Sequence, residues 1–176
     1  MSAAALGDPL ARVAQALRAE GGLLANAVRT PARGVAGPGL VAGGGPRASG
    51  RGPEYAALVE AMYEGYLAHY DVPRLLDTAD RDLALLAGDR LYAMGLGWLV
   101  ELSDLEAVIE LAETISLAAS ARARGLVELA EAAWAAGAVA VGFGATAEHR
   151  AAKQAAREGN AGAESLLRAA ARRPAP

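Results

Sequence analysis

The chain has 176 residues, of which 53% are hydrophobic and only 5% aromatic, and it contains no cysteine. The lack of cysteine excludes disulfides, thiolate metal sites and a cysteine nucleophile, and it fits a reducing compartment. Alanine and leucine dominate and lose little entropy in a helix, so the composition favours helices over sheets. This composition predicts an all-α protein. The first residues do not show the basic start and apolar block of a secretory signal, so we also expect a cytoplasmic location.

The chain has a net charge of −3, and the charged residues are unevenly distributed along it. Residues 1–53 carry +4, residues 54–120 carry −10 and residues 121–176 carry +3. We interpret this as an acidic middle that folds against its own basic ends. The basic residues are dispersed and lack interleaved aromatic residues, so we expect no nucleic-acid partner.

Residues 1–29 form the first predicted unit, a short amphipathic helix. Asp8 is placed to cap it, and Pro9 suits the first helical position. The next segment, 30–53, is rich in Gly, Pro and Arg and offers little apolar surface to bury. We predict that this segment is a flexible, disordered linker.

Residues 54–173 form the predicted helical domain, a bundle that gives the chain about four to six helices. Apolar residues at helical spacing predict helices over 54–70 and 80–101. Ser103 and Glu106 have the spacing of a capping box for a third helix that runs to about 124. That helix presents one apolar stripe, which consists of Leu105, Val108, Ile109, Ala112, Ile115 and Ala119. A further helix follows from 126, and a terminal, alanine-rich helix covers 147–173.

Residues 132–147 contain no charged side chain. The run is shorter than the roughly 20 residues that a membrane-spanning helix needs. A helix buried in the protein is therefore the favoured interpretation. The alternative is a helical structural or membrane-associated protein attached through residues 126–147, with peripheral membrane contact.

Asp77, Asp80 and Asp82 are the weak candidates for a metal site, because acids at this spacing lie near one another when the helix begins early. The favoured interpretation is structural. Asp77 or Thr78 caps the helix, and the other acids complement its positive N-terminus.

The helix over 80–101 has a seam of small residues at Ala84, Gly88 and Gly95, which favours the close approach of another helix. Apolar residues surround the rest of the helix, so it should be central. Asp89 would then be a buried acid, and burial of an unpaired charge is costly. We therefore expect a specific partner for Asp89.

The stretch LALLAGDRLYAMGLGWLVEL, residues 83–102, resembles the Ala-Gly-Asp helix of the all-α polyprenyl diphosphate synthases, the trans-prenyltransferases. Ala87, Gly88 and Asp89 match that motif. LAETISLAASARARG and LAEAAWAAGAVAVGFGA are similar to later helices of the family, and the likeness covers residues 54–145. The resemblance implies an isoprenoid-synthase-like helical bundle.

Active members of that family hold magnesium with two aspartate-rich motifs, and this chain has neither. Where the first motif is expected the chain reads EAMYEGYLAHY, and no Asp follows Gly144. Nothing is then available to hold the magnesium that neutralises a leaving diphosphate, so we expect no catalytic residues and no cofactor.

The resemblance implies a non-catalytic accessory subunit that supports isoprenoid chain elongation. The expected partner is a catalytic prenyl synthase subunit or a second copy of the chain. The remaining alternative is an active prenyl-diphosphate enzyme that binds Mg²⁺ at a displaced site formed by Asp77, Asp80 and Asp82.

Overall fold

The structure, a computed structural model, describes residues 7–31, 37–77 and 79–172. These residues form nine α-helices and one 3-10 turn, and their one β-type pairing is an isolated bridge between Val28 and Leu76. The all-α prediction is confirmed. The predicted number of helices is too low because three short helices, α3, α4 and α10, lack a long periodic pattern in the sequence.

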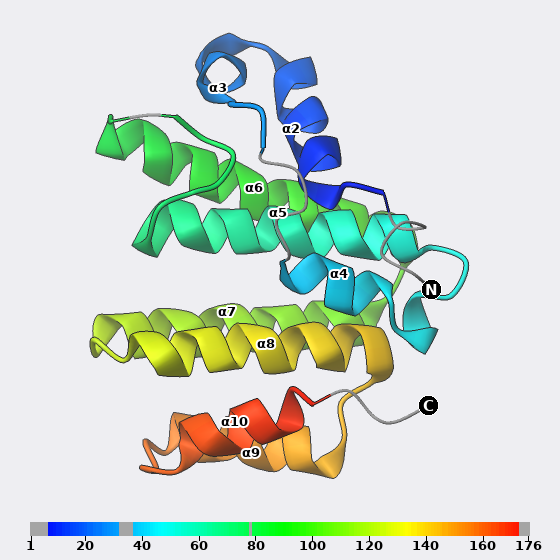
Figure 1. Cartoon of the computed structure of the whole chain (residues 1–176), viewed down its shortest axis with the longest axis vertical. Coiled ribbons are helices and arrows are strands. Elements are labelled where there is room, and N and C mark those ends of the chain that lie inside the picture. The colour runs from blue at the N-terminus through cyan, green and yellow to red at the C-terminus, as the bar shows by residue number, and fades with distance from the viewer. Residues whose placement is uncertain (1–6, 32–36, 78, 173–176) are drawn as a thin grey trace.

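Two helical hairpins form the centre of the molecule (Figure 1). One pairs α5 with α6, the other pairs α7 with α8, and the short α4 packs against both α5 and α8. The helices α2 and α3 lie beyond α5, and α9 and α10 lie beyond α8 (Figure 1). The elements are α2 (Pro9–Glu20), α3 (Gly22–Ala27), α4 (Pro38–Gly43), η1 (Pro46–Ala48), α5 (Gly52–Tyr70), α6 (Arg81–Leu102), α7 (Leu105–Ala123), α8 (Val127–Phe143), α9 (Ala147–Arg157) and α10 (Ala163–Ala170).

The N-terminal helix α2 forms as predicted and belongs to a second hydrophobic cluster, on the α5–α6 side of the molecule. The Asp8 carboxylate accepts a hydrogen bond from the Ala11 amide at 3.0 Å, and Pro9 follows it. Val13 and Leu17 are fully buried in a cluster that also contains Leu91 of α6. The described part of the predicted unit 1–29 therefore packs on the bundle, and residues 1–6 lie outside the described residues.

The predicted flexible linker is wrong for residues 37–53. This segment forms α4, η1 and the start of α5, with Ala42 and Ala48 fully buried. Its glycines serve close packing rather than flexibility: a Cβ on Gly45 would lie 2.1 Å from the Gly142 carbonyl oxygen. Backbone contact between α8 and this segment supplies the buried surface that its side chains lack. Residues 32–36 of the predicted linker lie outside the described residues.

The small-residue seam of α6 is confirmed. Ala84, Gly88 and Gly95 are buried, and they face α5 where the two helices run closest. A Cβ on Gly88 would lie 2.6 Å from the His69 ring, and one on Gly95 would lie 2.4 Å from Met62. Glycine at these positions therefore sets the distance between α5 and α6.

Helix α7 begins and packs differently from its prediction. Its cap is Asp104, whose carboxylate accepts from the Ala107 amide at 3.0 Å, while Ser103 has φ 55° and ends α6. The buried face consists of Ala107, Glu110, Leu111, Thr114, Leu117, Ala118 and Ala121. The predicted stripe lies on the neighbouring face, where Leu105 and Ile109 are exposed.

Helix α8 is the central buried helix. Its buried residues are Ala130, Ala132–Trp134 and Ala136–Gly142, on all its sides. Helices α4, α7 and α10 pack against it. By length and composition alone, α6 is the one described helix that could cross a membrane, although 39% of its most apolar window is buried.

Candidate functional site

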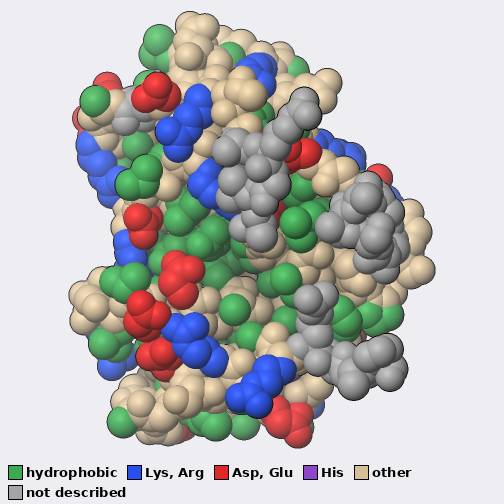
Figure 2. Space-filling view, in the orientation of Figure 1, with side chains coloured by type: hydrophobic (Ala, Val, Ile, Leu, Met, Phe, Trp, Pro, Cys, Tyr) green, Lys and Arg blue, Asp and Glu red, His purple; other side chains and the backbone are tan. Residues whose placement is uncertain are grey.

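An apolar pocket of about 420 Å³ lies between α5 and α8, with α4 as a third wall. Space-filling atoms show a hollow lined with hydrophobic side chains between these helices (Figure 2). A volume of this size is in the range of small-molecule sites. Its lining residues are Gly37, Pro38, Val41, Tyr63, Glu131, Trp134, Ala135, Ala138, Val139 and Ala171.

Aromatic rings form the inner wall of the pocket. Tyr63 meets Trp134 edge to face with centroids 5.1 Å apart, and Tyr66 stacks beside Tyr63 at 5.7 Å. Such pairs prefer edge-to-face or offset geometries, and each holds the other in one orientation. Tyr63 and Tyr66 are three residues apart on α5, which places both rings on the side that faces α8.

Glu131 is the acidic group of the pocket. Its carboxylate accepts hydrogen bonds from the Tyr63 hydroxyl at 3.1 Å and from the Tyr66 hydroxyl at 3.4 Å. Burial, together with the Glu131 charge, raises the pKa of Tyr63, and the same two causes raise that of Tyr66 to about 12. Both phenols therefore stay protonated donors at neutral pH. Among the described residues, no cationic side chain lies within 4.0 Å of the Glu131 carboxylate.

Trp134 brings a second polar group to this wall. Its side chain is 2% exposed, and its indole N–H has no hydrogen-bond acceptor among the described residues. A buried donor without a partner carries a desolvation penalty of about 1–3 kcal/mol. The indole nitrogen itself is inaccessible, so the pocket combines apolar and aromatic walls with one carboxylate.

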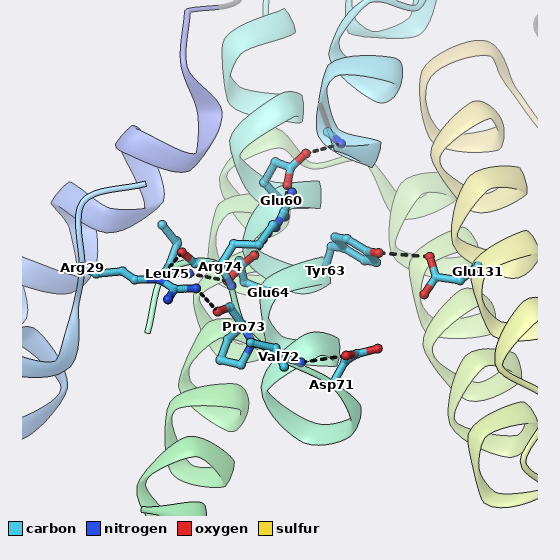
Figure 3. A network of polar contacts seen from close by, with 11 residues as sticks. Arg29, Glu60, Tyr63, Glu64, Asp71, Val72, Pro73, Arg74, Leu75 and Glu131 are labelled. Atoms are coloured by element: carbon cyan, nitrogen blue, oxygen red, sulfur yellow. Dashed lines mark hydrogen bonds and ion pairs between the residues drawn. The ribbon is translucent and has the colours of Figure 1, made fainter. Parts of the chain in front are cut away.

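A buried charge cluster lies directly behind the Tyr63 ring (Figure 3). The Arg74 guanidinium stands 5.1 Å from the ring centroid and pairs with both Glu60 and Glu64 of α5. Each glutamate also accepts from the backbone: Glu60 from the Gly39 amide at 2.9 Å, and Glu64 from the Leu75 amide at 3.0 Å. These bonds tie α4, α5 and the loop after α5 together.

Arg74 and Glu60 show the opposing effects of burial and charge. Burial raises the pKa of Glu60, and the attraction of Arg74 offsets this only in part. Burial alone would lower the pKa of Arg74, but Glu60 and Glu64 raise it above its ordinary value. Arg29 holds this loop from the other side, since its guanidinium donates to the Pro73 and Arg74 carbonyls at 2.7 and 2.8 Å (Figure 3).

Of the three aspartates proposed as a metal site, Asp80 has a structural role. The Asp80 carboxylate caps α6, accepting from the Asp82 and Leu83 amides at 2.9 and 3.2 Å. The Asp77 amide donates to the Ala27 carbonyl at 2.9 Å, next to the Val28–Leu76 bridge, which joins the segment after α3 to the loop before α6. Within the described part of the chain, no group of three or more His, Asp or Glu side chains is arranged to hold a metal ion. Thr78 lies outside the described residues.

The Ala-Gly-Asp triplet of α6 divides between core and surface. Ala87 and Gly88 are buried, whereas the Asp89 side chain is 72% exposed. The prediction of a buried acid is therefore wrong, because Asp89 lies just beyond the seam. It does have the expected partner, since its carboxylate lies 3.1 Å from His69 Nε2.

A second buried charge cluster joins α7 to α9 at a distance from the pocket. Lys153 Nζ donates to Glu110 at 2.7 Å and also bonds Glu113. His149 lies beside this cluster at the start of α9 and is 5% exposed. Two glutamates of α7 therefore belong to an interface with α9.

Two leucines, a valine and an isoleucine of α6 and α7 remain exposed on either side of the turn that joins these helices. We call this group the α6–α7 apolar surface, and it consists of Leu96, Val100, Leu105 and Ile109. Val100 and Leu105 are 74% and 70% exposed. The two helices lie behind α5 and α8 in Figure 1, and none of the four residues lines the pocket.

Comparisons with known proteins identify no relative of this chain. No family model, no curated protein and no solved structure matches it.

Sequence reasoning missed the residues that build the pocket. Tyr63 and Trp134 are 71 positions apart, and only the packing of α5 on α8 brings them together. A signal for the cluster behind them was present: Glu60 and Glu64 are four residues apart in an otherwise apolar helix, with Arg74 just beyond its end.

Proposed function

We propose that this chain is a non-catalytic, polyprenyl-synthase-like accessory subunit that supports isoprenoid chain elongation by a catalytic partner. The observation that carries the proposal is the α6–α7 apolar surface. Half of it belongs to α6, the helix that resembles the Ala-Gly-Asp helix of the synthases. Apolar side chains grouped on a protein surface are typical of interaction sites.

The partner that we propose is a full-length prenyl synthase that carries both aspartate-rich motifs. The surface that meets this chain should have an apolar centre and a basic rim. Glu101 flanks the apolar residues and is exposed, and the segment 54–120 carries a net charge of −10. Opposite charges around an apolar contact favour one orientation of docking.

The test is co-expression of the chain with the full-length prenyl synthase of its own host, followed by affinity purification and light scattering. We expect a stoichiometric complex and a change in the length of the prenyl product when this chain is present. Val100→Glu and Ile109→Glu should each weaken the complex at least about tenfold, because a carboxylate would be buried without a partner.

Leu23→Glu and Leu166→Glu are the matched controls. Both leucines are exposed, but they belong to α3 and α10 rather than to the α6–α7 apolar surface. The controls should leave the complex intact. A clean homo-oligomer without the synthase would contradict the proposal. So would a loss of affinity for the synthase that is as large in the control variants as in Val100→Glu and Ile109→Glu.

A further inference from the structure

The pocket between α5 and α8 combines a carboxylate, two aromatic rings and aliphatic walls. We propose that it binds a small organic cation, an ammonium or amidinium group attached to a short apolar body. This inference goes beyond the accessory-subunit role and does not depend on it, because the pocket and the α6–α7 apolar surface share no residue.

The first argument is the charge of Glu131. Two tyrosine hydroxyls fix the carboxylate in place, yet no cation of the described residues neutralises it. The nearby guanidiniums have other partners. Arg74 is matched by Glu60 and Glu64, and Arg122, which lies 5.8 Å from the Tyr66 ring centroid, bonds the Tyr70 carbonyl and lies 3.4 Å from Asp71.

The second argument is the chemistry of the walls. Trp134 and Tyr63 present aromatic rings, and a cation near such rings gains from their quadrupoles. The remaining walls are aliphatic, with Val41, Ala138 and Val139 among them. They suit a short apolar body more than a strongly hydrated ion. A bare metal ion is disfavoured, because it would require several oxygen ligands and the pocket offers one carboxylate.

The third argument is the placement of Trp134 relative to Glu131. Trp134 follows Glu131 by three residues, so both side chains lie on one face of α8. A cation whose ammonium meets the Glu131 carboxylate therefore also lies against the aromatic wall of the pocket.

The experiment uses the full chain and three probes of equal length: hexylammonium, 1-hexanol and hexanoate. Binding is followed by calorimetry and by Trp134 fluorescence in a Trp98→Phe background, since the chain has only two tryptophans. We expect hexylammonium to bind with a Kd below about 1 mM and at least about tenfold more tightly than 1-hexanol. Hexanoate should bind more weakly than either.

Glu131→Gln keeps an oxygen acceptor for the tyrosines but removes the charge, and it should abolish the preference for hexylammonium over 1-hexanol. Glu128→Gln is the matched control on the same helix, because Glu128 is exposed, pairs with Arg168 and does not line the pocket. Ala135→Phe, at the exposed rim, should block all three probes. Circular dichroism verifies that each variant is folded.

Three results would overturn the inference. The first is the absence of hexylammonium binding to the folded wild-type chain. The second is equal affinity for hexylammonium and 1-hexanol, which would make the pocket a purely apolar site. The third is a loss of hexylammonium affinity in Glu128→Gln as large as that in Glu131→Gln, which would indicate a general charge effect. None of these results bears on docking through the α6–α7 apolar surface.

Discussion

Replacement of Arg74 by methionine tests how the buried charge cluster supports the fold. Methionine keeps much of the length of the arginine side chain but removes the guanidinium. The Glu60 and Glu64 side chains, which are 1% and 0% exposed, would then lose the cation that pairs with both. Their backbone donors, the amides of Gly39, Arg74 and Leu75, would remain.

The expected loss of folding free energy is large. Removal of one partner from a buried ion pair costs about 3–5 kcal/mol, because the remaining charge stays buried without compensation. A domain of this size has an unfolding free energy of about 5–15 kcal/mol, and its Tm should fall by roughly 10 °C. Glu60→Gln combined with Arg74→Met should recover part of the loss, since the amide oxygen still accepts from Gly39.

The loss should also depend on pH in a defined direction. Burial raises the pKa of Glu60 in the folded state, so ionisation of this carboxyl opposes folding, and the opposition grows as the pH rises above the ordinary glutamate range. Arg74 counteracts this effect, and its removal should raise the pKa of Glu60 further. The deficit of Arg74→Met should therefore be greatest near pH 7.5 and shrink towards pH 5.

Urea denaturation, followed by circular dichroism at several pH values, measures this prediction. The wild-type chain at each pH provides the reference, so that other titrating groups cancel in the difference. A loss below about 1 kcal/mol, or a loss that does not change between pH 7.5 and pH 5, would refute the reasoning.

Two further predictions concern packing and the second charge cluster. Gly88→Ala should destabilise the protein by about 1–3 kcal/mol, because the added methyl would lie 2.6 Å from the His69 ring. Gly97→Ala in the same helix should be neutral or stabilise by up to about 1 kcal/mol, because a Cβ there meets nothing within 4 Å; thermal melts compare the two, and equal effects would contradict the packing argument. Lys153→Met should cost about 3–5 kcal/mol by leaving Glu110 buried without its cation, and urea titrations that show the double variant Glu110→Gln, Lys153→Met to be no more stable would contradict this explanation.

The sequence predicts the long helices well where the apolar periodicity agrees with the signals that start and stop a helix. Pro53 and the Asp71-Val72-Pro73 stop enclose α5, and the α6 seam is recognisable from its small residues. Helix α7 shows where this reasoning fails. Large apolar residues occupy one face, but the buried face that packs against α8 mixes three alanines with Leu111, Leu117 and the polar Glu110 and Thr114. The positions of the large apolar residues therefore identify the wrong side when the buried face also contains small and polar residues.

The segment 37–48 shows a second limit. Gly and Pro in a row predict flexibility, because such residues add little apolar surface. Here glycine allows backbone to touch backbone: a Cβ on Gly45 would lie 2.1 Å from the carbonyl oxygen of Gly142 in α8. Whether glycine loosens a chain or packs it depends on the surface that it meets, and that surface lies far away in the sequence.

Asp89 and its neighbour Arg90 show a third limit, since an acid in the middle of an apolar helix is predicted to be buried. Both instead leave the core, Asp89 towards His69 and Arg90 towards Glu20 of α2, which accepts at 2.6 and 2.7 Å. The apolar residues around them are not all buried either, since Leu86, Leu96 and Val100 are exposed. An apolar composition therefore does not by itself show that a helix is buried.

The buried charge cluster behind the pocket holds two of the pocket walls in place. Glu60 accepts from the Gly39 amide, and Gly39 belongs to α4, which supplies the pocket wall through Pro38 and Val41. Arg74 holds Glu60 and also lies over the Tyr63 ring. The same guanidinium therefore fixes two walls, one through a carboxylate and one through a ring face. Because α4 has only six residues and cannot be stable alone, the shape of the pocket depends on this cluster as much as on the residues that line it.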